Sequence, residues 1–431
     1  MLYYSTNRSS PEVDFREAAI KGQAPDKGLY FPGSIPTIDP ELIRNIEQVS
    51  NEDIAFQVIR PFVGQTIPDE VLSKIAGESI AFPIPLVKVT DDIYSLELFH
   101  GPTLAFKDVG ARFMSRCLGY FLAGNEKKVT VLVATSGDTG GAVANGFFGV
   151  DGVEVVILYP SGKVSPVQEK QLTTLGGNIR ALEVDGSFDD CQSLVKQAFM
   201  DKDLNEAIFL TSANSINVAR WLPQQFYYLL AYKQWINKNE APVISVPSGN
   251  FGNICAGLMA HAGGLPVKHF IAACNANDVV TRYLANGKYE PLPAVPTLSN
   301  AMDVGQPSNF VRIMEIFNNS FDDLGRVLSS YTVTDAQTLD TIRNVSSETG
   351  YMPDPHGAVA YRALELYGQS NPGTQGIFLE TAHPVKFPEA IELATGAAVE
   401  IPEMVRSIMS LEKKSTRIDP SFDTLKKFLL G

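Results

Sequence analysis

The feature that most constrains the fold is an alternation of short apolar runs with amphipathic stretches from about residue 93 onward. The runs are rich in β-branched residues and are followed by segments of helical character; they cover 129–135, 153–159, 178–184, 242–248 and 267–273. A run that is apolar at nearly every position suits a strand buried on both faces, as in parallel sheets whose crossovers are helices. The sequence therefore predicts an α/β architecture in which helices cover the sheets.

The first 80 residues have a different texture and predict a mostly helical region. Asp39 precedes Pro40, and Ser50 lies three residues before Asp53, two arrangements typical of helix starts. A Pro-rich segment at 289–309 is expected to run irregularly, over the surface, beside a site or as a structural crossover.

Charge and composition exclude several classes of function. The 431 residues include 35 Lys and Arg against 48 Asp and Glu, a net charge of −13, which disfavours a nucleic-acid surface. No apolar run approaches the ~20 residues that span a bilayer, and the start lacks the order of a secretory signal. The cysteines 117, 191, 255 and 274 are far apart, which suggests neither disulfides nor a zinc site. We expect a cytoplasmic protein without metal, membrane or nucleic-acid partners.

Two glycine-containing turns follow apolar runs at the points where helices are expected to begin. They are TSGDTG at 135–140 and PSGNFGN at 247–253. Backbone amides at a helix start favour anions, and open α/β sheets bind ligands at the carboxyl ends of their strands. Ordinary helix capping explains either turn alone, but two of them favour an anionic ligand. The fingerprints GxGxxG, GxxxxGK[ST], HExxH and GxSxG are all absent, so a nucleotide-binding enzyme, a zinc hydrolase or a serine esterase has little support.

A lysine in an apolar setting stands out. Lys107 follows Leu104, Ala105 and Phe106 and begins a helical stretch. An amine held against apolar groups near the amino end of a helix loses stabilisation of its protonated form, which suits Schiff-base chemistry. The alternative is a surface lysine that pairs with Asp108 or caps the helix.

Five motifs, read in order, carry a resemblance: HGPTLAFKD at 100–108, ATSGDTG at 134–140, SANSINVAR at 212–220, PSGNFGN at 247–253 and TAHPVKF at 381–387. Together with YSTN and APDKGLYFP near the start, they make the chain resemble the threonine synthase family across essentially its whole length. These are pyridoxal-phosphate enzymes, and their fold resembles that of the tryptophan synthase beta subunit. The resemblance implies two open, twisted, mostly parallel sheets flanked by helices, and a mostly helical N-terminal region.

The resemblance also implies a domain organisation. Residues 1–80 form the N-terminal region, 81–400 the catalytic region with a nested α/β subdomain around 110–210, and 401–431 a helical extension. Oligomeric state stays open between monomer and homodimer.

The cofactor site implied by the resemblance centres on Lys107, which carries pyridoxal 5'-phosphate as a Schiff base. The PSGNFGN turn holds the phosphate, Asp138 lies close to the ring hydroxyl, and Thr381 faces the pyridine nitrogen. The implied cofactor-binding residues are Lys107, Asp138, Ser248, Gly249, Asn250, Phe251, Gly252, Asn253 and Thr381. Whether Asp138 is ionised stays open, and His383 and Lys386 either stand behind the site or pack locally.

The substrate site follows from the same resemblance. Ser136, Gly137 and Thr139 bind a carboxylate, and Asn214, Ser215 and Arg220 grip a phosphate. A helix starting near residue 217 brings Arg220 about one turn from Ser215. Without the resemblance, a solvated Arg on a helix face is the better interpretation.

The implied reaction converts O-phospho-L-homoserine and water to L-threonine and phosphate by γ-elimination and β-addition of water. A related phospholyase or dehydratase would use the same lysine and stop before water addition. A non-catalytic ligand-binding relative is the third possibility, and the intact lysine with both turns disfavours it.

Overall fold

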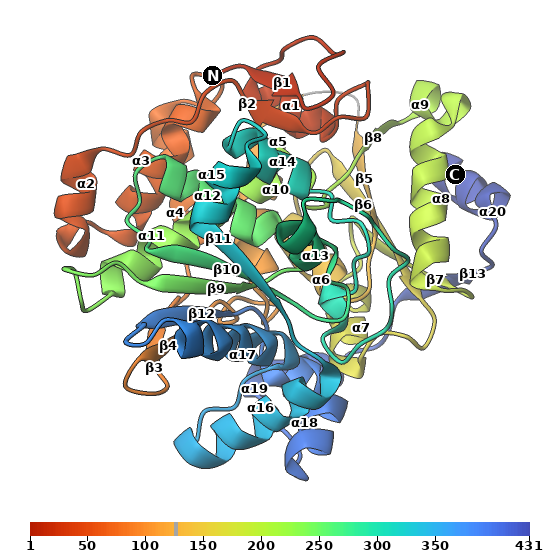
Figure 1. Cartoon of the computed structure of the whole chain (residues 1–431). Coiled ribbons are helices and arrows are strands. Elements are labelled where there is room, and N and C mark those ends of the chain that lie inside the picture. The colour runs from red at the N-terminus through yellow and green to blue at the C-terminus, as the bar shows by residue number, and fades with distance from the viewer. Residues whose placement is uncertain (125–127) are drawn as a thin grey trace.

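The computed structural model describes residues 1–124 and 128–431, which form a six-stranded, a five-stranded and a small two-stranded sheet (Figure 1). The predicted α/β class is confirmed, and each of the five apolar runs forms a strand. Those strands are β5 (Val129–Ala134), β6 (Val153–Pro160), β7 (Ile179–Val184), β9 (Val243–Pro247) and β10 (His269–Cys274).

The five-stranded sheet is parallel throughout and has the order β13-β7-β6-β5-β8, completed by β8 (Phe209–Thr211) and β13 (Ser415–Ile418). Successive side chains point to opposite faces, so Leu132 packs in one core cluster and Val131 in another. One face carries α8 (Phe188–Met200), α9 (Lys202–Ala207) and α20 (Phe422–Leu430). The other carries α5 (Lys107–Leu122), α6 (Asp138–Phe147) and α7 (Pro166–Thr173). Both faces are thus buried, as the continuous apolar runs predicted.

The six-stranded sheet has the order β11-β10-β9-β12-β4-β3 and is parallel except for its last pair. Its other strands are β3 (Leu86–Lys88), β4 (Ile93–Glu97), β11 (Leu328–Thr332) and β12 (Gly376–Glu380). Ile244 packs on the side of α11 (Gln225–Gln234) and α12 (Gly252–Ala262), and Val243 on the side of α17 (Pro355–Ser370).

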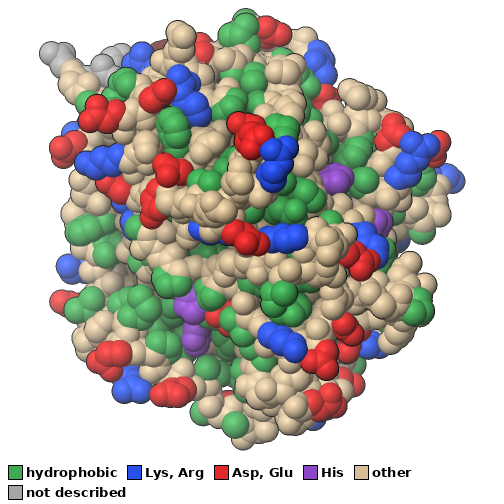
Figure 2. Space-filling view, turned by 90° about the vertical axis from the view of Figure 1, so that its left-hand side faces the viewer, with side chains coloured by type: hydrophobic (Ala, Val, Ile, Leu, Met, Phe, Trp, Pro, Cys, Tyr) green, Lys and Arg blue, Asp and Glu red, His purple; other side chains and the backbone are tan. Residues whose placement is uncertain are grey.

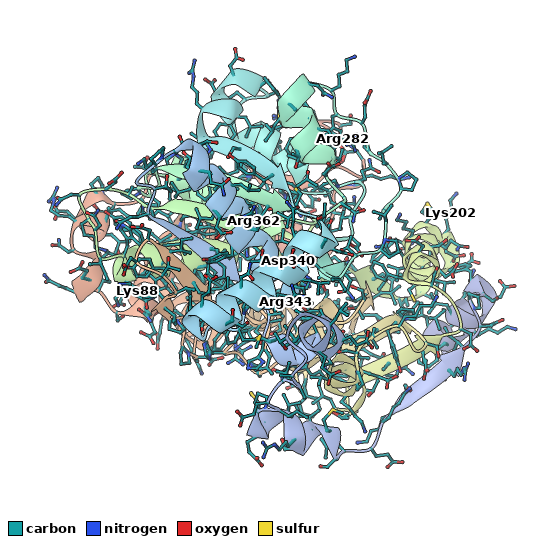
Figure 3. The ribbon with its side chains drawn as sticks, turned by 60° about the horizontal axis from the view of Figure 1, so that its bottom comes forward. Lys88, Lys202, Arg282, Asp340, Arg343 and Arg362 are labelled. Atoms are coloured by element: carbon teal, nitrogen blue, oxygen red, sulfur yellow. The ribbon has the colours of Figure 1, made fainter. Side chains whose placement is uncertain are left out.

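Helix α16 (Asp335–Thr349) packs against α17 and forms an outer layer, on which Asp340 and Arg343 form an exposed ion pair of 2.6 Å (Figure 3).

Each large sheet has one strand at which the chain reverses its direction of travel across the sheet. From β5 the chain proceeds to β6 on one side and returns later as β8 on the other; from β9 it proceeds to β10 and returns as β12. Such switch points open a crevice at the carboxyl ends of the strands. The two glycine turns of the sequence follow β5 and β9, so the topology places both at the openings where ligands bind.

The N-terminal region contains four helices and a two-stranded antiparallel sheet. These are α1 (Phe15–Lys21), α2 (Pro40–Arg44), α3 (Asn51–Val63), α4 (Asp69–Ser79), β1 (Tyr3–Ser5) and β2 (Tyr30–Pro32). The expected caps are present, since the Ser50 hydroxyl accepts from the Asp53 amide and Asp39 from the Glu41 amide. The mostly helical character is confirmed, and the small sheet is an addition to it.

The remaining elements connect and cover the sheets. They are α10 (Val218–Trp221), α13 (Val279–Asn286), α14 (Phe310–Ile316), α15 (Phe321–Val327), α18 (Pro388–Thr395), α19 (Glu403–Met409) and the 3-10 turns η1 (Ile46–Gln48), η2 (Leu222–Gln224), η3 (Asn300–Met302) and η4 (Pro384–Lys386). The Pro-rich segment 289–309 is irregular apart from η3, as predicted. The expected helical extension 401–431 also contains a strand, β13. This strand pairs with β7, and the pairing buries Ile418.

The surface carries mixed charge, and on the face drawn in Figure 2 basic and acidic side chains are interspersed. All four cysteines are buried and free. Within residues 1–124 and 128–431, no helix is both long and apolar enough to cross a bilayer.

Candidate active site

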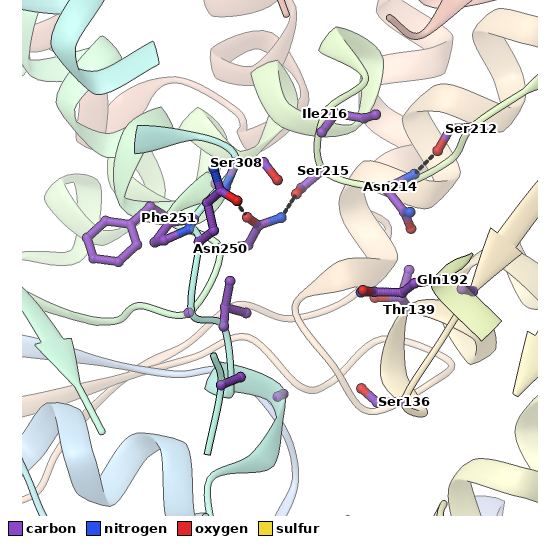
Figure 4. Close-up of a pocket in the computed structure, with 18 of the residues that line it drawn as sticks. Ser136, Thr139, Gln192, Ser212, Asn214, Ser215, Ile216, Asn250, Phe251 and Ser308 are labelled. Carbon is purple, nitrogen blue, oxygen red and sulfur yellow. Dashed lines mark hydrogen bonds between the residues drawn. The ribbon is translucent and has the colours of Figure 1, made fainter. Parts of the chain in front are cut away.

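A cavity of about 1890 Å³ opens between the two large sheets. It is bounded by the ends of β5 and β9, by the Pro-rich segment and by residues around 21–27 of the N-terminal region. Of the predicted site residues, Gly137 and Ser248 do not line it. The others do: Lys107, Ser136, Asp138, Thr139, Asn214, Ser215, Arg220, Gly249, Asn250, Phe251, Gly252, Asn253 and Thr381. In Figure 4, Ser136 and Thr139 lie across the cavity from Asn250 and Phe251.

Lys107 is the first residue of α5, and its side chain is only 18% exposed. Its Nζ lies 5.6 Å from the centre of the Phe106 ring and 3.9 Å from the Asp138 carboxylate. Burial lowers the pKa of the Lys107 amine; Asp138 opposes this shift, whereas the charges of Lys386 and Arg220 add to it. Asp108 is not its partner, because both of its oxygens accept hydrogen bonds from Thr103. The structure therefore excludes a surface lysine paired with Asp108.

Asp138 begins α6 and is 4% exposed. Its Oδ1 accepts hydrogen bonds from Gln168 at 2.9 Å and from Lys386 at 2.7 Å. Burial alone would raise the pKa of this carboxyl, but the charges of Lys386 and Lys107, together with these hydrogen bonds, hold it well below its usual value. The pairing with Lys386 and the lowered pKa both favour the ionised form of Asp138.

The turn after β9 leaves a run of backbone donors without partners. The amides of Gly249 to Asn253 donate to no group in the described part of the chain, and no side chain caps α12. Phe251 has a φ of 59°, in the left-handed region, which directs the chain into the helix. A Cβ at Gly249 would lie 2.6 Å from the Met302 Cα, so only glycine fits between η3 and the cavity. Outward-facing amides at the start of an 11-residue helix form an anion site.

Side chains around this turn are fixed by a network of hydrogen bonds. Asn250 donates to the Ser215 hydroxyl at 2.8 Å and accepts from the Ser308 amide at 2.6 Å (Figure 4). Asn309 also donates to the Ser215 oxygen, which leaves the hydroxyl hydrogen of Ser215 free to donate. The Nδ2 of Asn253 is buried and has no partner among the described residues.

The turn after β5 is built differently. Thr135 Oγ1 accepts from the amides of Gly137 and Gly140, each at 2.9 Å, so these two amides serve the turn itself. Gly137 has a φ of 140°, and a Cβ there would collide with the Gln168 side chain. The hydroxyls of Ser136 and Thr139 face the cavity, as Figure 4 shows. Gly137 thus shapes the turn, and its neighbours present polar groups to the cavity.

Arg220 lies on α10, whose first amides are capped by Asn217, as expected for a helix starting there. The Arg220 side chain is 4% exposed, and its Nη1 donates to the Ala213 carbonyl. Its Nε is buried without a partner in the described structure, and Arg220 is one of the residues that line the cavity. Burial lowers the pKa of this guanidinium to about 10, against the opposing effect of Tyr227 and Asp108, so it stays charged at neutral pH. A buried cation with an unused donor is a site for an anion.

Thr381 follows β12, and its carbonyl accepts from the Phe106 amide at 2.8 Å, which fixes it beside Lys107. Ser248 is buried, and its hydroxyl donates to the Val246 carbonyl at 2.8 Å, which explains why it does not reach the cavity.

Several residues of the site were missed by sequence reasoning or left undecided by it. Lys386 is fully buried against Asp138, and His356 lines the cavity while its Nε2 accepts from the Ala301 amide at 3.2 Å. Gln224 contributes a buried Oε1 with no partner in the described residues. Only Lys386 lay within a recognised motif; the others come from segments without a local signature.

Comparison with known families gives three matches along the chain. Residues 2–80 match "Threonine synthase N terminus", 83–379 match "Pyridoxal-phosphate dependent enzyme", and 357–429 match "Threonine synthase, C-terminal".

Individual relatives agree with these matches. The chain is 46% identical to the threonine synthase of Serratia marcescens, covering 100% of this chain and 99% of the relative. The crystal structure of threonine synthase from Escherichia coli superposes with a TM-score of 0.92 at 45% identity, covering 100% and 99% of the two chains. The pyridoxal-phosphate-bound threonine synthase of Brucella melitensis gives 0.93 at 35% identity, with the same coverage.

The described residues fit this cofactor. A mostly buried amine, a run of free amides and the unpartnered Nδ2 of Asn253 supply the groups that an aldehyde bearing a phosphate requires. With its family matches over nearly the whole chain and its close structural relatives, the chain belongs to the threonine synthase family of pyridoxal-phosphate-dependent enzymes.

Proposed function

We propose that the protein converts O-phospho-L-homoserine and water into L-threonine and phosphate by γ-elimination followed by β-addition of water. The observation that carries this proposal is that Arg220, a buried cation, lines the same cavity as Lys107 and the two turns. One anion site serves the cofactor, and a second cationic site remains for a phosphate on the substrate. A substrate with an amine, a carboxylate and a phosphate matches this set of groups.

For the cofactor, the free amides of Gly249 to Asn253 and the Nδ2 of Asn253 bind the phosphate. Lys107 would hold the cofactor covalently through its Nζ, and Asp138 and Thr381 would bind its ring hydroxyl and its ring nitrogen. When bound, the cofactor supplies a conjugated system that accepts electrons from carbon. A neutral hydroxyl at Thr381 would not hold the ring nitrogen protonated.

For the substrate, the hydroxyls of Ser136 and Thr139 bind the carboxylate at the start of α6, where the helix dipole adds a favourable field. The phosphate is bound by Asn214, by the free hydrogen of the Ser215 hydroxyl and by Arg220. The guanidinium suits this task because its donors meet phosphate oxygens in pairs.

Lys107 moves the protons. Once displaced by the substrate amine, its Nζ takes the proton from the substrate Cα and releases it again, so that it can take a second proton from Cβ. The bond between Cγ and the phosphate oxygen then breaks, and the phosphate leaves with the bonding electrons. Cγ gains a proton, the hydroxyl of a water molecule adds to Cβ, and a proton returns to Cα to give threonine. Because one amine acts as base more than once, it must exist partly in its neutral form at working pH, which the lowered pKa of Lys107 supports.

The direct test is product identification with O-phospho-L-homoserine as the sole substrate of the purified, cofactor-loaded protein. We expect L-threonine and inorganic phosphate in equal amounts. Phosphate with 2-oxobutanoate in place of threonine would support the alternative, a phospholyase or dehydratase on the same fold. Absence of phosphate release would reject both.

We also propose that residues 1–80, 81–400 and 401–431 act as the N-terminal, catalytic and C-terminal regions, with a nested subdomain around 110–210. The family matches to residues 2–80 and 83–379 support the boundary between residues 80 and 81. The third match begins at residue 357, well before the proposed boundary between residues 400 and 401. We further propose a cytoplasmic location and a monomer or homodimer; size-exclusion chromatography with light scattering distinguishes the two oligomeric states.

A further inference from the structure

A second lysine stands directly behind the reactive one. Lys386, in η4, is fully buried, and its Nζ lies 2.7 Å from Asp138 Oδ1 and 2.7 Å from the Thr103 carbonyl oxygen, to which it donates. A buried ammonium group is costly unless it is paired and hydrogen-bonded, and this one meets both conditions.

The two oxygens of the Asp138 carboxylate have different surroundings. Oδ1 accepts from Lys386 and from Gln168, so it is held by the protein. Oδ2 faces Lys107 Nζ at 3.9 Å, which is too long for a hydrogen bond. The carboxylate is thus held by the oxygen that faces Lys386, and it leaves the reactive amine without a strong acceptor.

The charged groups around Lys107 come from several elements. Asp138 on α6, Lys386 on η4 and Arg220 on α10 act on it directly, so one anion meets three cations when Lys107 is protonated. Behind them, Asp108 interacts with Lys386 and Arg220, and His383 with Lys386. Lys386 is the only one of these cations that contacts the Asp138 carboxylate within hydrogen-bond distance.

We propose that Lys386 is a positioning residue that neutralises Asp138 inside the protein, so that Lys107 remains a free amine. This inference rests on the proposed function, in which Lys107 Nζ forms the bond to the cofactor and moves the protons. Without Lys386, Lys107 would be the cation nearest to the Asp138 carboxylate. The carboxylate would then stabilise the protonated form of Lys107. The amine would then be a poorer nucleophile and a poorer base at neutral pH.

The test measures the protonation of Lys107 through its reaction with the cofactor. Cofactor-free protein is mixed with pyridoxal 5'-phosphate from pH 6 to pH 10, quenched with borohydride, and the modified Lys107 peptide is quantified by mass spectrometry. Only the neutral amine reacts, and all variants see the same cofactor solution, so a change in the midpoint of the rate profile reports a change at Lys107.

Three substitutions separate charge from contact. Lys386→Met removes both, Lys386→Gln keeps donors without charge, and Lys386→Arg keeps both. We expect the midpoint to rise by about one pH unit or more in the first two, which slows attachment at pH 7 about tenfold, and to stay near wild type in the third. Adding Asp138→Asn to Lys386→Met should bring the midpoint back to the wild-type value or below it.

Lys426→Met is the control, because Lys426 also forms ion pairs, with Asp201 and Asp203, but it lies on α20 and does not line the cavity. A midpoint in Lys386→Gln equal to that of wild type and of this control would overturn the proposal, even if Lys386→Met fails to fold. A wild-type protein that attaches no cofactor at Lys107 would instead reject the proposed function, so the two failures are distinguishable.

Discussion

The two glycine turns occupy equivalent places in their sheets, after the switch strands β5 and β9, yet they are built for different tasks. At the turn after β9, the amides from Gly249 to Asn253 have no partner among the described residues, and the Ser215 and Asn309 side chains that hydrogen-bond to Asn250 are neutral. At the turn after β5, Thr135 occupies two of the amides, and the ionised Asp138 lies between two lysines.

The difference shows how one fold can place anion binding at one turn and proton transfer at the other. A neutral lining with free amides binds an anion at any pH near neutrality, because nothing in it titrates. A cluster of ionised groups responds to proton transfer, which a reaction that moves protons requires. We therefore expect substitutions at the turn after β9 to change cofactor binding, and substitutions near the turn after β5 to change turnover.

The largest expected effect comes from Gly249→Ala. The new Cβ would meet the Met302 backbone at 2.6 Å, so η3 or the turn must move and the run of amides loses its alignment. We expect cofactor affinity to fall by more than about 100-fold, measured by absorbance titration, by analogy with the cost of overpacking. Gly368→Ala is the control, because a Cβ there meets nothing within 4 Å. Unchanged affinity in Gly249→Ala would show that the turn from Gly249 to Asn253, here called the cup, is not where the cofactor phosphate binds.

Arg220→Gln should separate the substrate phosphate from the cofactor phosphate. A hydrogen bond to a charged group contributes about 1.5–3 kcal/mol, so kcat/KM for the phosphorylated substrate should fall by about 10- to 150-fold. Cofactor affinity should stay within about twofold of wild type, because the cup is intact. Arg343→Gln, on the exposed face of α16, is the control. A parallel loss of cofactor affinity would show that the two anion sites are not separate.

The carboxyl of Asp108 tests whether the groups that gain or lose protons lie near the turn after β5. Burial raises the pKa of its carboxyl to about 6, although the Thr103 hydrogen bonds and the charge of Lys386 oppose the shift. Between the unfolded value of 3.8 and about 6, the folded protein keeps a proton that the unfolded chain has released. Stability should therefore fall as pH rises through this window, by about 3 kcal/mol in total.

The measurement for Asp108 is urea unfolding of the cofactor-free protein from pH 4.5 to pH 7. The stability of wild type relative to Asp108→Asn should decline as pH rises. A constant or rising difference would show that the carboxyl is ionised throughout this range.

Ser215→Ala should give the smallest effect and tests the link between the two regions. The Ser215 hydroxyl oxygen accepts hydrogen bonds from the side-chain amides of Asn250 and Asn309. Without it, these two hydrogen bonds are replaced by bonds to water at the edge of the cup. A net hydrogen bond contributes about 1 kcal/mol, so cofactor affinity should weaken by about fivefold in a titration. Ser347→Ala, in the exposed part of α16, is the control. A loss as large as that of Gly249→Ala would mean that the cup depends on side chains more than on its backbone.

Local pattern predicted the parts of the site that depend on neighbouring residues. The apolar residues before Lys107 and its place at a helix start are both visible within a few positions, and so are the turns at strand ends. The order of strands in a sheet is not local, so the sequence could not show that β5 and β9 are the switch strands. Nor could it show that Thr135 occupies the Gly137 amide, because that depends on the detailed path of the turn.

Contacts between residues far apart in the chain were harder to predict from the sequence. Asp138 and Lys386 were each singled out, but their contact joins motifs from different sheets and follows only from the packed fold. Strand β13 was missed because its four residues are mostly exposed or half-buried and resemble a loop. His356 carried no motif, and its position over η3 emerges only when α17 packs on the sheet.

Strand β13 has a consequence for how the chain can be shortened. It supplies the outer partner of β7, whose own residues are largely buried, and α20 then closes over the same layer. Removing the last twenty or so residues would leave β7 as an open edge with unpaired backbone groups, a template for association with other chains. Clones that end before Ser415 should therefore collect in inclusion bodies, although every residue lining the cavity is still encoded.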